Sequence, residues 1–380
     1  MRRLERVLML LPSAGIGGAE VHSAWLAQAL AASGVTVRLA IGPAARDRFA
    51  GLLGRGLAPA LSAAAIDWNP DETTAGNHAR QSAAAAALLA EWRPDVAVLP
   101  LPWPTHALGI QEVLAAVPVL AVAHLAPREP DAADVAAARA TRLGPTCWVA
   151  VSAPVAGRLA HCFGLPAGAV ATVPNGVAVP PWDPVRQAAA RAAKRITLGL
   201  PEAARLVVFA GRLEPNKGAD LLPRLAARLH ARCGAVLAAL GEGPLRPRLA
   251  RHPAAAKGAL RLLGHAADMD EWLLAADALL LPSRLEGCPL VFLEAAAHRC
   301  PVVATGAALE ALGDAVFGLA AMAPDASVTS LVDRVEACLA EPLATSGRVA
   351  AAWRHAVAHD RAAMLRRYAG LLRTLPGLRV

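Results

Sequence analysis

One stretch in the last third of the chain reads as a complete strand–loop–helix–strand unit. The apolar run at residues 278–281 is typical of a buried strand, which Pro282 ends. A helix is expected from Pro289 to His298, because proline fits the first helical position, where its missing N–H costs nothing. Residues 301–304 predict the next strand. Such a unit belongs in a parallel sheet covered by helices.

The helix of this unit is expected to offer an anion site. The N–H groups of Leu290, Val291 and Phe292 have no acceptor within the first turn and favour phosphate. Glu286 lies before the helix and Glu294 inside it, and carboxylates accept sugar or ribose hydroxyls. The pattern therefore predicts a ligand with phosphate and hydroxyl groups. A generic α/β unit with two solvated glutamates is the alternative.

The bulk properties limit the class of protein. A chain of 380 residues, 56% of them hydrophobic, predicts two domains with separate cores. The net charge of +8 suits an acidic substrate, such as a nucleotide diphosphate, or an anionic membrane face. Nucleic acid is not expected as a partner, because no basic tract is interleaved with aromatic residues.

The cysteines and the N-terminus indicate a cytoplasmic protein. The six cysteines are scattered without a C-x-x-C pair, which favours reduced thiols and argues against zinc. The first residues imitate a signal peptide, but the apolar run at 7–11 is short and predicts a first strand instead. No apolar run is long enough to predict a membrane-spanning helix.

A glycine-rich turn follows that first strand. Gly17, Gly18 and Glu20 lead into a helix expected to end at Ser33, before a strand at residues 35–41. Glycines in the first turn of a strand–helix–strand unit let the backbone approach a phosphate closely. Glu20 stands where a dinucleotide fingerprint has its third glycine, so a tight turn without a ligand is the alternative.

The first half continues as alternating helices and strands. Helices are expected at residues 77–92 and 105–114, and strands at 96–99, 117–123 and 146–151. His124 follows the strand at 117–123, at the carboxyl edge where ligands of parallel sheets gather. A loop histidine without a function is the alternative.

The second half opens with a strand at residues 206–210 and the loop Gly211 to Gly218. Arg212 and Lys217 on this loop could neutralise the charge that grows on a leaving diphosphate. Arginine and lysine at this spacing are common in proteins, so the spacing alone does not identify a diphosphate site. The later strand at 260–263 ends at His265.

A further acidic pair, Asp268 and Asp270, has the D-x-D spacing of some metal sites. It precedes Glu271 and Trp272 instead of ending a strand, so Asp268 is expected to cap a helix and no metal is proposed.

These motifs together resemble one family. EGCPLVFLEA with Glu286 and Glu294, GRLEPNKG with Arg212 and Lys217, and GGAE at residues 17–20 resemble the retaining group 1 glycosyltransferases of family 4. VPNGV at residues 173–177 is also similar. The chain departs from the family at Leu125, where Asp often follows the histidine, and at Ala178, where Asp is usual.

The resemblance implies an α/β GT-B fold, two doubly wound Rossmann-like domains facing a cleft. The expected limits are 1–179 for the acceptor-side domain, 180–355 for the nucleotide-sugar domain and 356–380 for the C-terminal helical segment returning to the first domain. The last helix is expected at about residues 349–372. It implies a metal-independent, retaining transfer of a hexosyl or related sugar from a nucleotide-sugar to a glycan, lipid-linked or small-molecule acceptor in cell-envelope polysaccharide or glycoconjugate synthesis.

The family's site residues carry over to matching positions of this sequence. Arg212 and Lys217 would stabilise the leaving diphosphate, Glu286 would hold the donor sugar, and His124 would face the acceptor. The implied donor contacts are Gly17, Gly18, Gly211, Arg212, Lys217, His265, Glu286, Gly287, Cys288, Leu290 and Glu294. No cofactor is expected, since the nucleotide-sugar is a substrate.

Two other functions stay open: a nucleotide-sugar epimerase on the same fold, and a non-catalytic nucleotide-sugar-binding protein.

The arginines near both ends of the chain also suggest weak peripheral contact with the inner membrane face, with a solvated basic face as the alternative. They are Arg2, Arg3, Arg6, Arg361, Arg366, Arg367 and Arg373.

Overall fold

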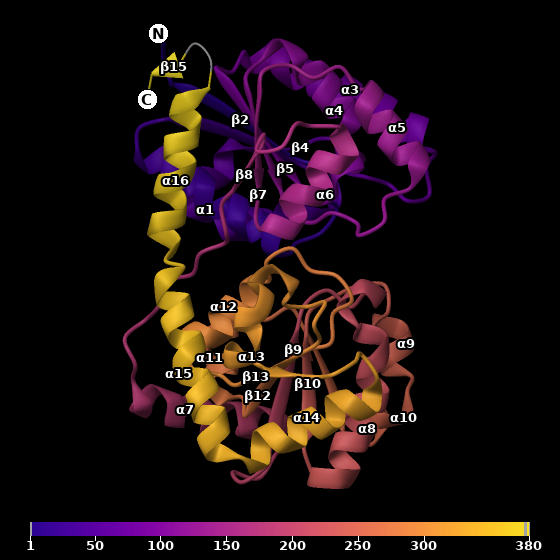
Figure 1. Ribbon diagram of the computed structural model, residues 1–380, viewed down its shortest axis with the longest axis vertical. Coiled ribbons are helices and arrows are strands. Elements are labelled where there is room, and N and C mark those ends of the chain that lie inside the picture. Colours follow the sequence, from indigo (N-terminus) through magenta and orange to yellow (C-terminus); the bar gives the residue numbers. More distant parts are fainter. Residues whose placement is uncertain (1, 376–377, 380) are drawn as a thin grey trace. The chain divides into compact units, whose positions relative to one another are not determined.

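The structure is a computed structural model that describes residues 2–375 and 378–379, with side chains from residue 4 to residue 375 (Figure 1). The chain divides into two compact units. Unit 1 comprises Met1–Asn175 and Ala362–Val380, and unit 2 comprises Gly176–Arg361. The sequence places these divisions at 179/180 and 355/356, a few residues away.

Unit 1 contains a parallel sheet of seven strands in the order β4-β3-β2-β5-β6-β7-β8. Its strands are apolar on both faces, as expected for a sheet buried between helices. In chain order they are β2 (Arg6–Leu11), β3 (Thr36–Ile41), β4 (Leu61–Ala63), β5 (Val96–Leu101), β6 (Val119–Ala123), β7 (Thr146–Ala150) and β8 (Val170–Thr172). A separate short pair joins β1 (Arg2–Arg3) to β15 (Leu378–Arg379) in parallel.

Helices cover both faces of this sheet. Successive residues of a strand point to opposite faces, so each apolar strand contributes to a core on either side. Val7 and Met9 pack with helices α1 (Gly18–Ala32), α2 (Arg46–Leu57) and α16 (Arg361–Thr374). Leu8 and Leu10 pack with α3 (Thr74–Trp92), α4 (Leu108–Val113), α5 (Ala132–Ala140) and α6 (Ala153–Phe163). Short 3₁₀ turns are η1 (Pro43–Ala45), η2 (Ala58–Ala60), η3 (Pro104–Ala107) and η4 (Leu114–Ala116).

Unit 2 contains a second parallel sheet, of six strands, in the order β11-β10-β9-β12-β13-β14. The strands are β9 (Leu206–Ala210), β10 (Val236–Leu240), β11 (Leu260–Gly264), β12 (Ala278–Leu281), β13 (Val302–Ala304) and β14 (Ala321–Met322). Its two cores again alternate along each strand: Val208 belongs to one and Val207 to the other.

The helices of unit 2 divide between the two faces of its sheet. Those packed on the side of Val207 are α8 (Leu222–Cys233), α9 (Arg246–Ala250), α10 (Pro253–Ala256) and α14 (Val328–Ala340). Those on the side of Val208 are α7 (Pro184–Leu198), α11 (Met269–Ala275), α12 (Leu290–Ala297), α13 (Val316–Leu319) and α15 (Pro342–Ala358). The 3₁₀ turns are η5 (Pro215–Lys217), η6 (Ala219–Leu221) and η7 (Glu310–Ala315).

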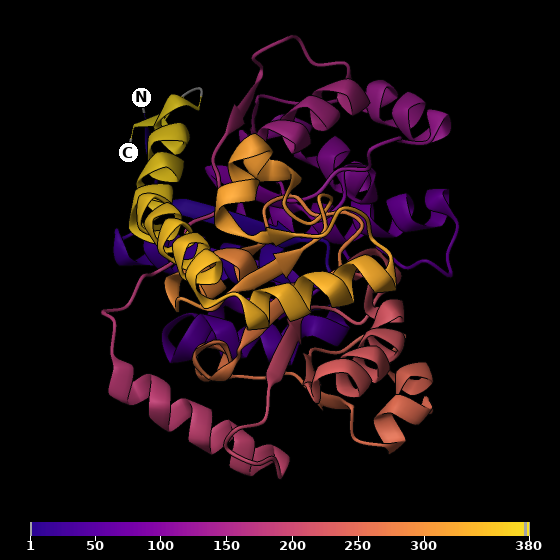
Figure 2. The ribbon, with the colours of Figure 1, turned by 60° about the horizontal axis from the view of Figure 1, so that its bottom comes forward.

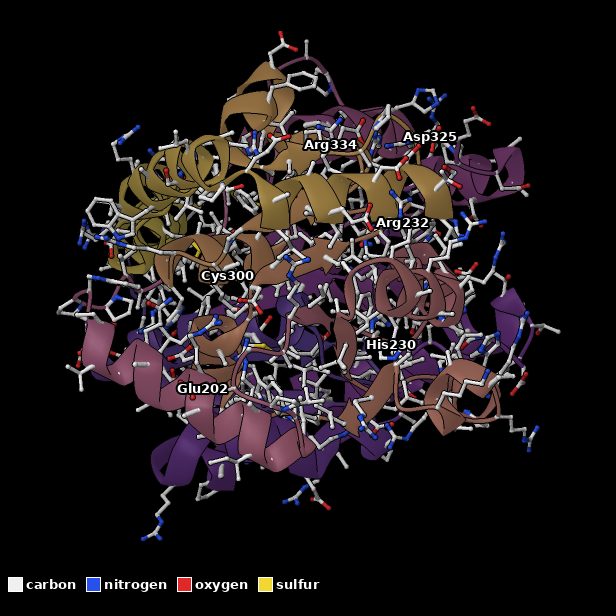
Figure 3. All side chains as sticks on the ribbon, turned by 90° about the horizontal axis from the view of Figure 1, so that it is seen from below. Glu202, His230, Arg232, Cys300, Asp325 and Arg334 are labelled. Atoms are coloured by element: carbon white, nitrogen blue, oxygen red, sulfur yellow. The ribbon has the colours of Figure 1, made fainter. Side chains whose placement is uncertain are left out.

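Helices α8 and α14 lie side by side on their face of the unit 2 sheet (Figure 2). Arg232 near the end of α8 reaches α14 (Figure 3), where its guanidinium donates to Asp333 at 2.6 Å and also pairs with Glu336. Cys300, also labelled in Figure 3, is buried on the other side, and burial raises the pKa of its thiol.

Each sheet has one point where the direction of chain progression reverses. In unit 1 it lies between the paired strands β2 and β5, and in unit 2 between β9 and β12. The loops after two such strands diverge to opposite faces and leave a crevice, which is where open α/β sheets bind ligands. These two points therefore locate the candidate sites.

The helix expected at residues 349–372 is in fact two helices, α15 and α16. The break lies at His359–Asp360, because the backbone there pairs with Val177 instead of continuing the helix. The N–H of Val177 donates to the carbonyl of His359 at 2.9 Å, and the N–H of Arg361 donates to Val177 at 3.1 Å. A side chain at Gly176 would lie 2.8 Å from the Cα of Arg361, so this crossing requires glycine.

The segment expected as one helix at 105–114 also differs. It forms η3, α4 and η4 in succession. Among the residues that the structure describes, no helix is both long enough and apolar enough to cross a membrane.

Candidate active site

Two loops of unit 2 meet at the switch point of its sheet. The loop Gly211 to Gly218 follows β9, and the loop from Pro282 to Pro289 follows β12. Leu279 of β12 pairs directly with Val208 of β9. Both motifs therefore leave neighbouring strands at the same carboxyl edge.

The structure brings two of the expected site residues into direct contact. Lys217 Nζ lies 2.6 Å from Glu286 Oε2, and both side chains are largely buried. Ser283 Oγ donates to the other oxygen, Glu286 Oε1, at 2.9 Å. Ser283 is itself held by Thr305, whose hydroxyl donates to the Ser283 carbonyl at 2.6 Å. The Glu286 carboxylate is therefore fixed in position before any ligand binds.

The two loops also touch through their backbones. Gly218 has a left-handed conformation, with φ of +70°, and any side chain there would collide with the carbonyl of Pro282. The N–H of Arg284 donates to the carbonyl of Asn216 at 2.7 Å. This contact sets the spacing between the loops, and so between Lys217 and Glu286.

Arg212 lies on the same loop but has a different partner. Its guanidinium pairs with Glu214 at 3.0 Å, and its side chain is 43% exposed. The neighbouring Gly211 donates its N–H to the carbonyl of Leu240 at the end of β10, at 2.9 Å. Arg212 therefore extends a long, partly exposed side chain from a backbone that is held in place, at the ligand edge of the sheet.

The start of α12 differs from the expectation in two respects. Pro289 is the N-cap residue, with an extended backbone, and Leu290 is the first helical residue. The N–H of Phe292 donates to the carbonyl of Pro289 at 3.2 Å, so this amide is already satisfied. The expected anion site must therefore rely on the amides before Phe292. Gly287, which is buried, and Cys288, which is half-buried, lead directly into this turn.

Glu294 lies within α12 in a setting that favours its neutral form. Burial, together with the negative charge of Asp270, raises the pKa of Glu294 to about 7. His298, one turn later and 5% exposed, places Nδ1 2.9 Å from the Glu294 carbonyl and Nε2 3.6 Å from Asp270. The sequence did not indicate that Asp270 and His298 belong beside Glu294.

Asp268 occupies the N-cap position of α11, as expected, but its side chain does not cap the helix. It pairs instead with Lys194 of α7, while Glu271 accepts from Arg186 at 2.7 Å. The two carboxylates of the D-x-D pattern therefore have separate partners, Lys194 for Asp268 and His298 for Asp270. His265, at the end of β11, is exposed.

In unit 1 the glycine-rich turn is closed by Glu20. Gly17 is the N-cap residue of α1, and its N–H donates to Glu20 Oε2 at 2.6 Å. The hydroxyl of Ser13 donates to the other oxygen. Glu20, which replaces the third glycine of a dinucleotide fingerprint, therefore shapes the turn, and the exposed Gly18 begins the helix.

His124 lies at the carboxyl end of β6, where it was expected, and is 9% exposed. Its ring meets that of His22 on α1 edge-on, with centroids 4.8 Å apart, and His22 in turn lies 5.0 Å from Tyr368 of α16. Burial lowers the pKa of His22 to about 4 and that of His124 well below its ordinary value. Both rings are neutral at pH 7. The sequence analysis missed His22. Its position two residues after Glu20 is the signal that could have identified it.

Doubly wound sheets with charged loops at the switch point define a two-domain α/β protein of the class that binds ligands at that point. Profiles of known families identify it further. Residues 16–179 match the profile described as Glycosyltransferase Family 4, and residues 204–341 match Glycosyl transferases group 1. The chain belongs to this family of glycosyltransferases.

Curated relatives match over part of their length. The D-inositol 3-phosphate glycosyltransferase of Streptomyces scabiei is 35% identical over 172 residues, which are 41% of this chain and 37% of the relative. The putative teichuronic acid biosynthesis glycosyltransferase TuaC of Bacillus subtilis is 38% identical over 111 residues, 29% of this chain and 27% of the relative. The matches thus span less than half of either relative.

Solved structures match over nearly the whole chain. Anabaena Alr3699/HepE in complex with UDP-glucose has a TM-score of 0.78 at 17% identity, covering 97% of this chain and 100% of that one. WaaG, a glycosyltransferase involved in lipopolysaccharide biosynthesis, has a TM-score of 0.71 at 18% identity, covering 98% and 100%. At such identities the likeness shows the fold, which is GT-B as the sequence predicted.

Proposed function

We propose that this protein transfers a sugar from a nucleoside-diphosphate sugar to a hydroxyl of an acceptor, with retention at the anomeric carbon. The contact between Lys217 and Glu286 across the switch point of unit 2, at 2.6 Å, carries this proposal. The contact places a cation that suits a diphosphate beside a carboxylate that suits sugar hydroxyls. In a nucleoside-diphosphate sugar the diphosphate and the sugar are directly bonded, so the donor matches both groups.

Arg212 and Lys217 would act on the leaving group. As the glycosidic bond to the diphosphate breaks, negative charge grows on the phosphate oxygens. A cation held nearby lowers the energy of that state, and it does so best when it need not reorganise. Lys217 meets this condition because Glu286 and the loop contacts fix it, and the first amides of α12 at Leu290 add partial positive charge.

The carboxylates would hold the hydroxylated parts of the donor. Glu286, kept in place by Ser283, would accept from the hydroxyls of the transferred sugar, and Glu294 from those of the ribose. Gly211 and His265 would border the nucleotide at the ends of β9 and β11. No pair of carboxylates in this arrangement suggests the double displacement of glycosidases.

Unit 1 would contribute the remaining contacts. Gly17 and Gly18 would approach the donor through their backbone at the start of α1. His124 would contact the acceptor near the reacting centre. Since its ring is neutral, it would orient a hydroxyl by hydrogen bonding rather than neutralise an anion.

The acceptor would be a glycan, a lipid-linked sugar or a small molecule in cell-envelope polysaccharide or glycoconjugate synthesis. The names of the relatives support this setting, since one names D-inositol 3-phosphate and the other teichuronic acid biosynthesis. The protein would work in the cytoplasm, with at most weak contact to the inner membrane face.

A donor screen tests the proposal directly. Thermal shift with UDP-, GDP- and ADP-sugars would identify the nucleotide, and NMR of the product's anomeric proton would report the stereochemistry of transfer. An inverted product would refute retention. Conversion of the donor sugar without any acceptor would favour an epimerase, and donor binding without turnover on any acceptor would favour a non-catalytic binding protein.

A further inference from the structure

Two histidine rings of unit 1 are in direct contact at the carboxyl edge of its sheet. His124 follows β6, and His22 lies on α1, close to the start of that helix. Their ring centroids are 4.8 Å apart and their planes 69° apart, so the edge of one ring meets the face of the other. His124 keeps 9% of its surface exposed and His22 only 1%. His22 can therefore affect a ligand only through its neighbours.

The backbone of His124 is fixed by the strands on both sides of β6. The N–H of His124 donates to the carbonyl of Leu101, the last residue of β5, at 3.0 Å. The carbonyl of Ala123, which precedes His124, accepts from the N–H of Val151 after β7 at 3.1 Å. What remains to be set is the rotation of the imidazole about its side-chain bonds.

No hydrogen bond to Nε2 sets that rotation. Nε2 of His124 is buried, and within the part of the chain that the structure describes it has no hydrogen-bond partner; the same is true of Nε2 of His22. Burial lowers the pKa of both rings and keeps them uncharged at pH 7, so an ion pair does not orient them either. The angle of the His124 ring therefore depends on packing, and the ring of His22 is packed against it.

Tyr368 of α16 supports His22. Its ring lies 5.0 Å from that of His22, again with the planes 69° apart, and its side chain is fully buried. Helices α1 and α16 lie side by side (Figure 1), and both contribute to one hydrophobic core, through Leu26 and Leu372 among others. The neighbouring helix therefore limits how far the ring of His22 can turn.

Helix α1 also carries the glycine-rich turn at its start. Gly17 is the N-cap residue, and its N–H donates to Glu20 at 2.6 Å. His22 follows Glu20 by two residues on the same helix. One rigid element thus holds both the turn that would approach the donor and the ring that packs against His124.

We propose that His22 is a positioning residue that fixes the ring angle of His124, so that His124 presents a single orientation to the acceptor hydroxyl. This inference rests on the proposed function, in which His124 contacts the acceptor. Without the His22 ring, the imidazole of His124 would sample further angles, and fewer encounters with the acceptor would be productive. Donor binding would not change, because His22 has no place among the donor contacts.

Kinetics on the full chain test this role. His22→Ala should lower kcat about ten- to hundredfold, the cost of misplacing a catalytic group, with the donor KM unchanged. His22→Phe keeps a ring at this position and should stay near the wild-type rate. In a His124→Ala background, His22→Ala should cause no further loss, because two residues that act as a unit are not additive. If His22→Ala does not fold, His22→Leu fills the space without a ring and should show the same loss.

NMR of the full chain follows His124 without needing turnover. Histidine labelled with ¹³C at Cε1 gives one signal per ring, and His124→Ala identifies the signal of His124. We expect a single sharp signal in the wild type and in His22→Phe, and a broadened or divided one in His22→Ala. Phe49→Leu is the matched control, because Phe49 is a fully buried ring of α2 in the same core. Its turnover and its His124 signal should match the wild type.

Equal losses from His22→Ala in the wild-type and His124→Ala backgrounds would overturn the proposal, since His22 would then act independently of His124. A sharp, single His124 signal in His22→Ala would overturn it as well, and so would a loss in His22→Phe as large as that in His22→Ala. A His124 signal that responds to His22 as expected, in a protein whose transfer survives His124→Ala or that transfers no sugar, would instead refute the proposed function of His124 alone.

Discussion

The guanidinium of Arg284 donates hydrogen bonds to both carboxylate oxygens of Asp220, from Nη1 to Oδ1 at 2.6 Å and from Nη2 to Oδ2 at 2.8 Å. Arg284 belongs to the loop after β12, and Asp220 lies in η6, three residues beyond Lys217. The same guanidinium also donates to the carbonyl of Pro215. One side chain therefore ties the two loops of the candidate active site together.

This ion pair matters for geometry more than for stability. The Arg284 side chain is 42% exposed and that of Asp220 28%, and exposed pairs contribute about 1 kcal/mol at most to the free energy of unfolding. The hydrogen bond from Arg284 nonetheless lowers the pKa of Asp220, so the pair stays charged in the neutral range. Its expected effect is to hold Lys217 against Glu286.

We predict that Arg284→Ala lowers kcat/KM about ten- to hundredfold while Tm changes little, because misplacing a catalytic group carries a large cost in rate. The double variant Arg284→Asp with Asp220→Arg should recover part of the loss. Steady-state kinetics on the three proteins measure this. The control is Arg232→Ala, which breaks a comparable pair with Asp333 between α8 and α14. Equal losses in Arg284→Ala and Arg232→Ala would contradict the positioning role.

Removing either cation of the first loop should slow turnover. We expect Arg212→Ala and Lys217→Ala each to reduce kcat by about 10²–10³ with the fold intact, because each removes a preorganised charge that stabilises the leaving diphosphate. Lys217→Arg should lose less. Lys257→Ala, on an exposed turn of the same unit, is the matched control. Near-normal turnover in both variants would show that the diphosphate binds elsewhere.

Donor affinity should depend on pH through Glu294. Its pKa is raised from 4.5 to about 7, so the carboxyl loses its proton as the pH rises through 7. The ionised form accepts two ribose hydroxyls, whereas the protonated form keeps one oxygen as a donor. We therefore expect Kd for a nucleotide-sugar to fall between pH 6 and pH 8. Isothermal titration with UDP-glucose measures this, since an esterified diphosphate has no terminal phosphate proton that titrates near pH 6.

Glu294→Gln should flatten that pH profile, and Glu202→Gln, at an exposed position of unit 2, should leave it unchanged. The stability of the folded chain should change with pH in the opposite direction to donor affinity. Glu294 binds its proton more tightly in the folded chain, so its contribution to the free energy of unfolding falls as the pH rises from 4.5 to about 7. A pH profile identical in the wild type and Glu294→Gln would exclude Glu294 from the nucleotide site.

Transfer should survive EDTA. The two carboxylates of the D-x-D pattern have other partners, and among the residues that the structure describes no group of three metal-ligating side chains lies together. Charge on the leaving diphosphate would be met by Arg212 and Lys217 instead. The measurement is the initial rate before and after chelation. Loss of rate that manganese or magnesium restores would contradict this.

Weak binding to anionic vesicles is expected at low salt. Arg366, Arg367 and Arg373 are exposed on α16, and each basic residue near such a surface contributes about 1 kcal/mol. Arg6 instead lies over the ring of Trp92, 4.3 Å from its centroid, and the side chains of Arg2 and Arg3 lie outside the described residues. Sedimentation with anionic vesicles, at low and high salt, measures the contact.

Changing the three α16 arginines to glutamine should abolish that sedimentation. The control makes the same charge change on α8, at Arg224, Arg228 and Arg232. No sedimentation of the wild type even at low salt would remove the membrane proposal and leave a soluble acceptor.

Much of the fold followed from local sequence patterns. Strands such as β9 and β12 were predicted with their observed bounds, because a short apolar run before a glycine or proline loop specifies a buried parallel strand. The position of Lys217 and Glu286 on loops after two strands of the second half followed as well, but the pairing of those strands, β9 and β12, came only from the structure.

The sequence by itself therefore determined the alternating strands and helices of two α/β domains and the residue types on the loops that follow the strands. Only the tertiary structure decided which side chains meet. It placed Arg284 on Asp220, Lys194 on Asp268, and Val177 on the break between α15 and α16. These partners are far apart in the chain, and their contact depends on strand order and on the angles between helices. Periodicity and capping signals act over a few residues, so they specify where an element begins but not what it touches.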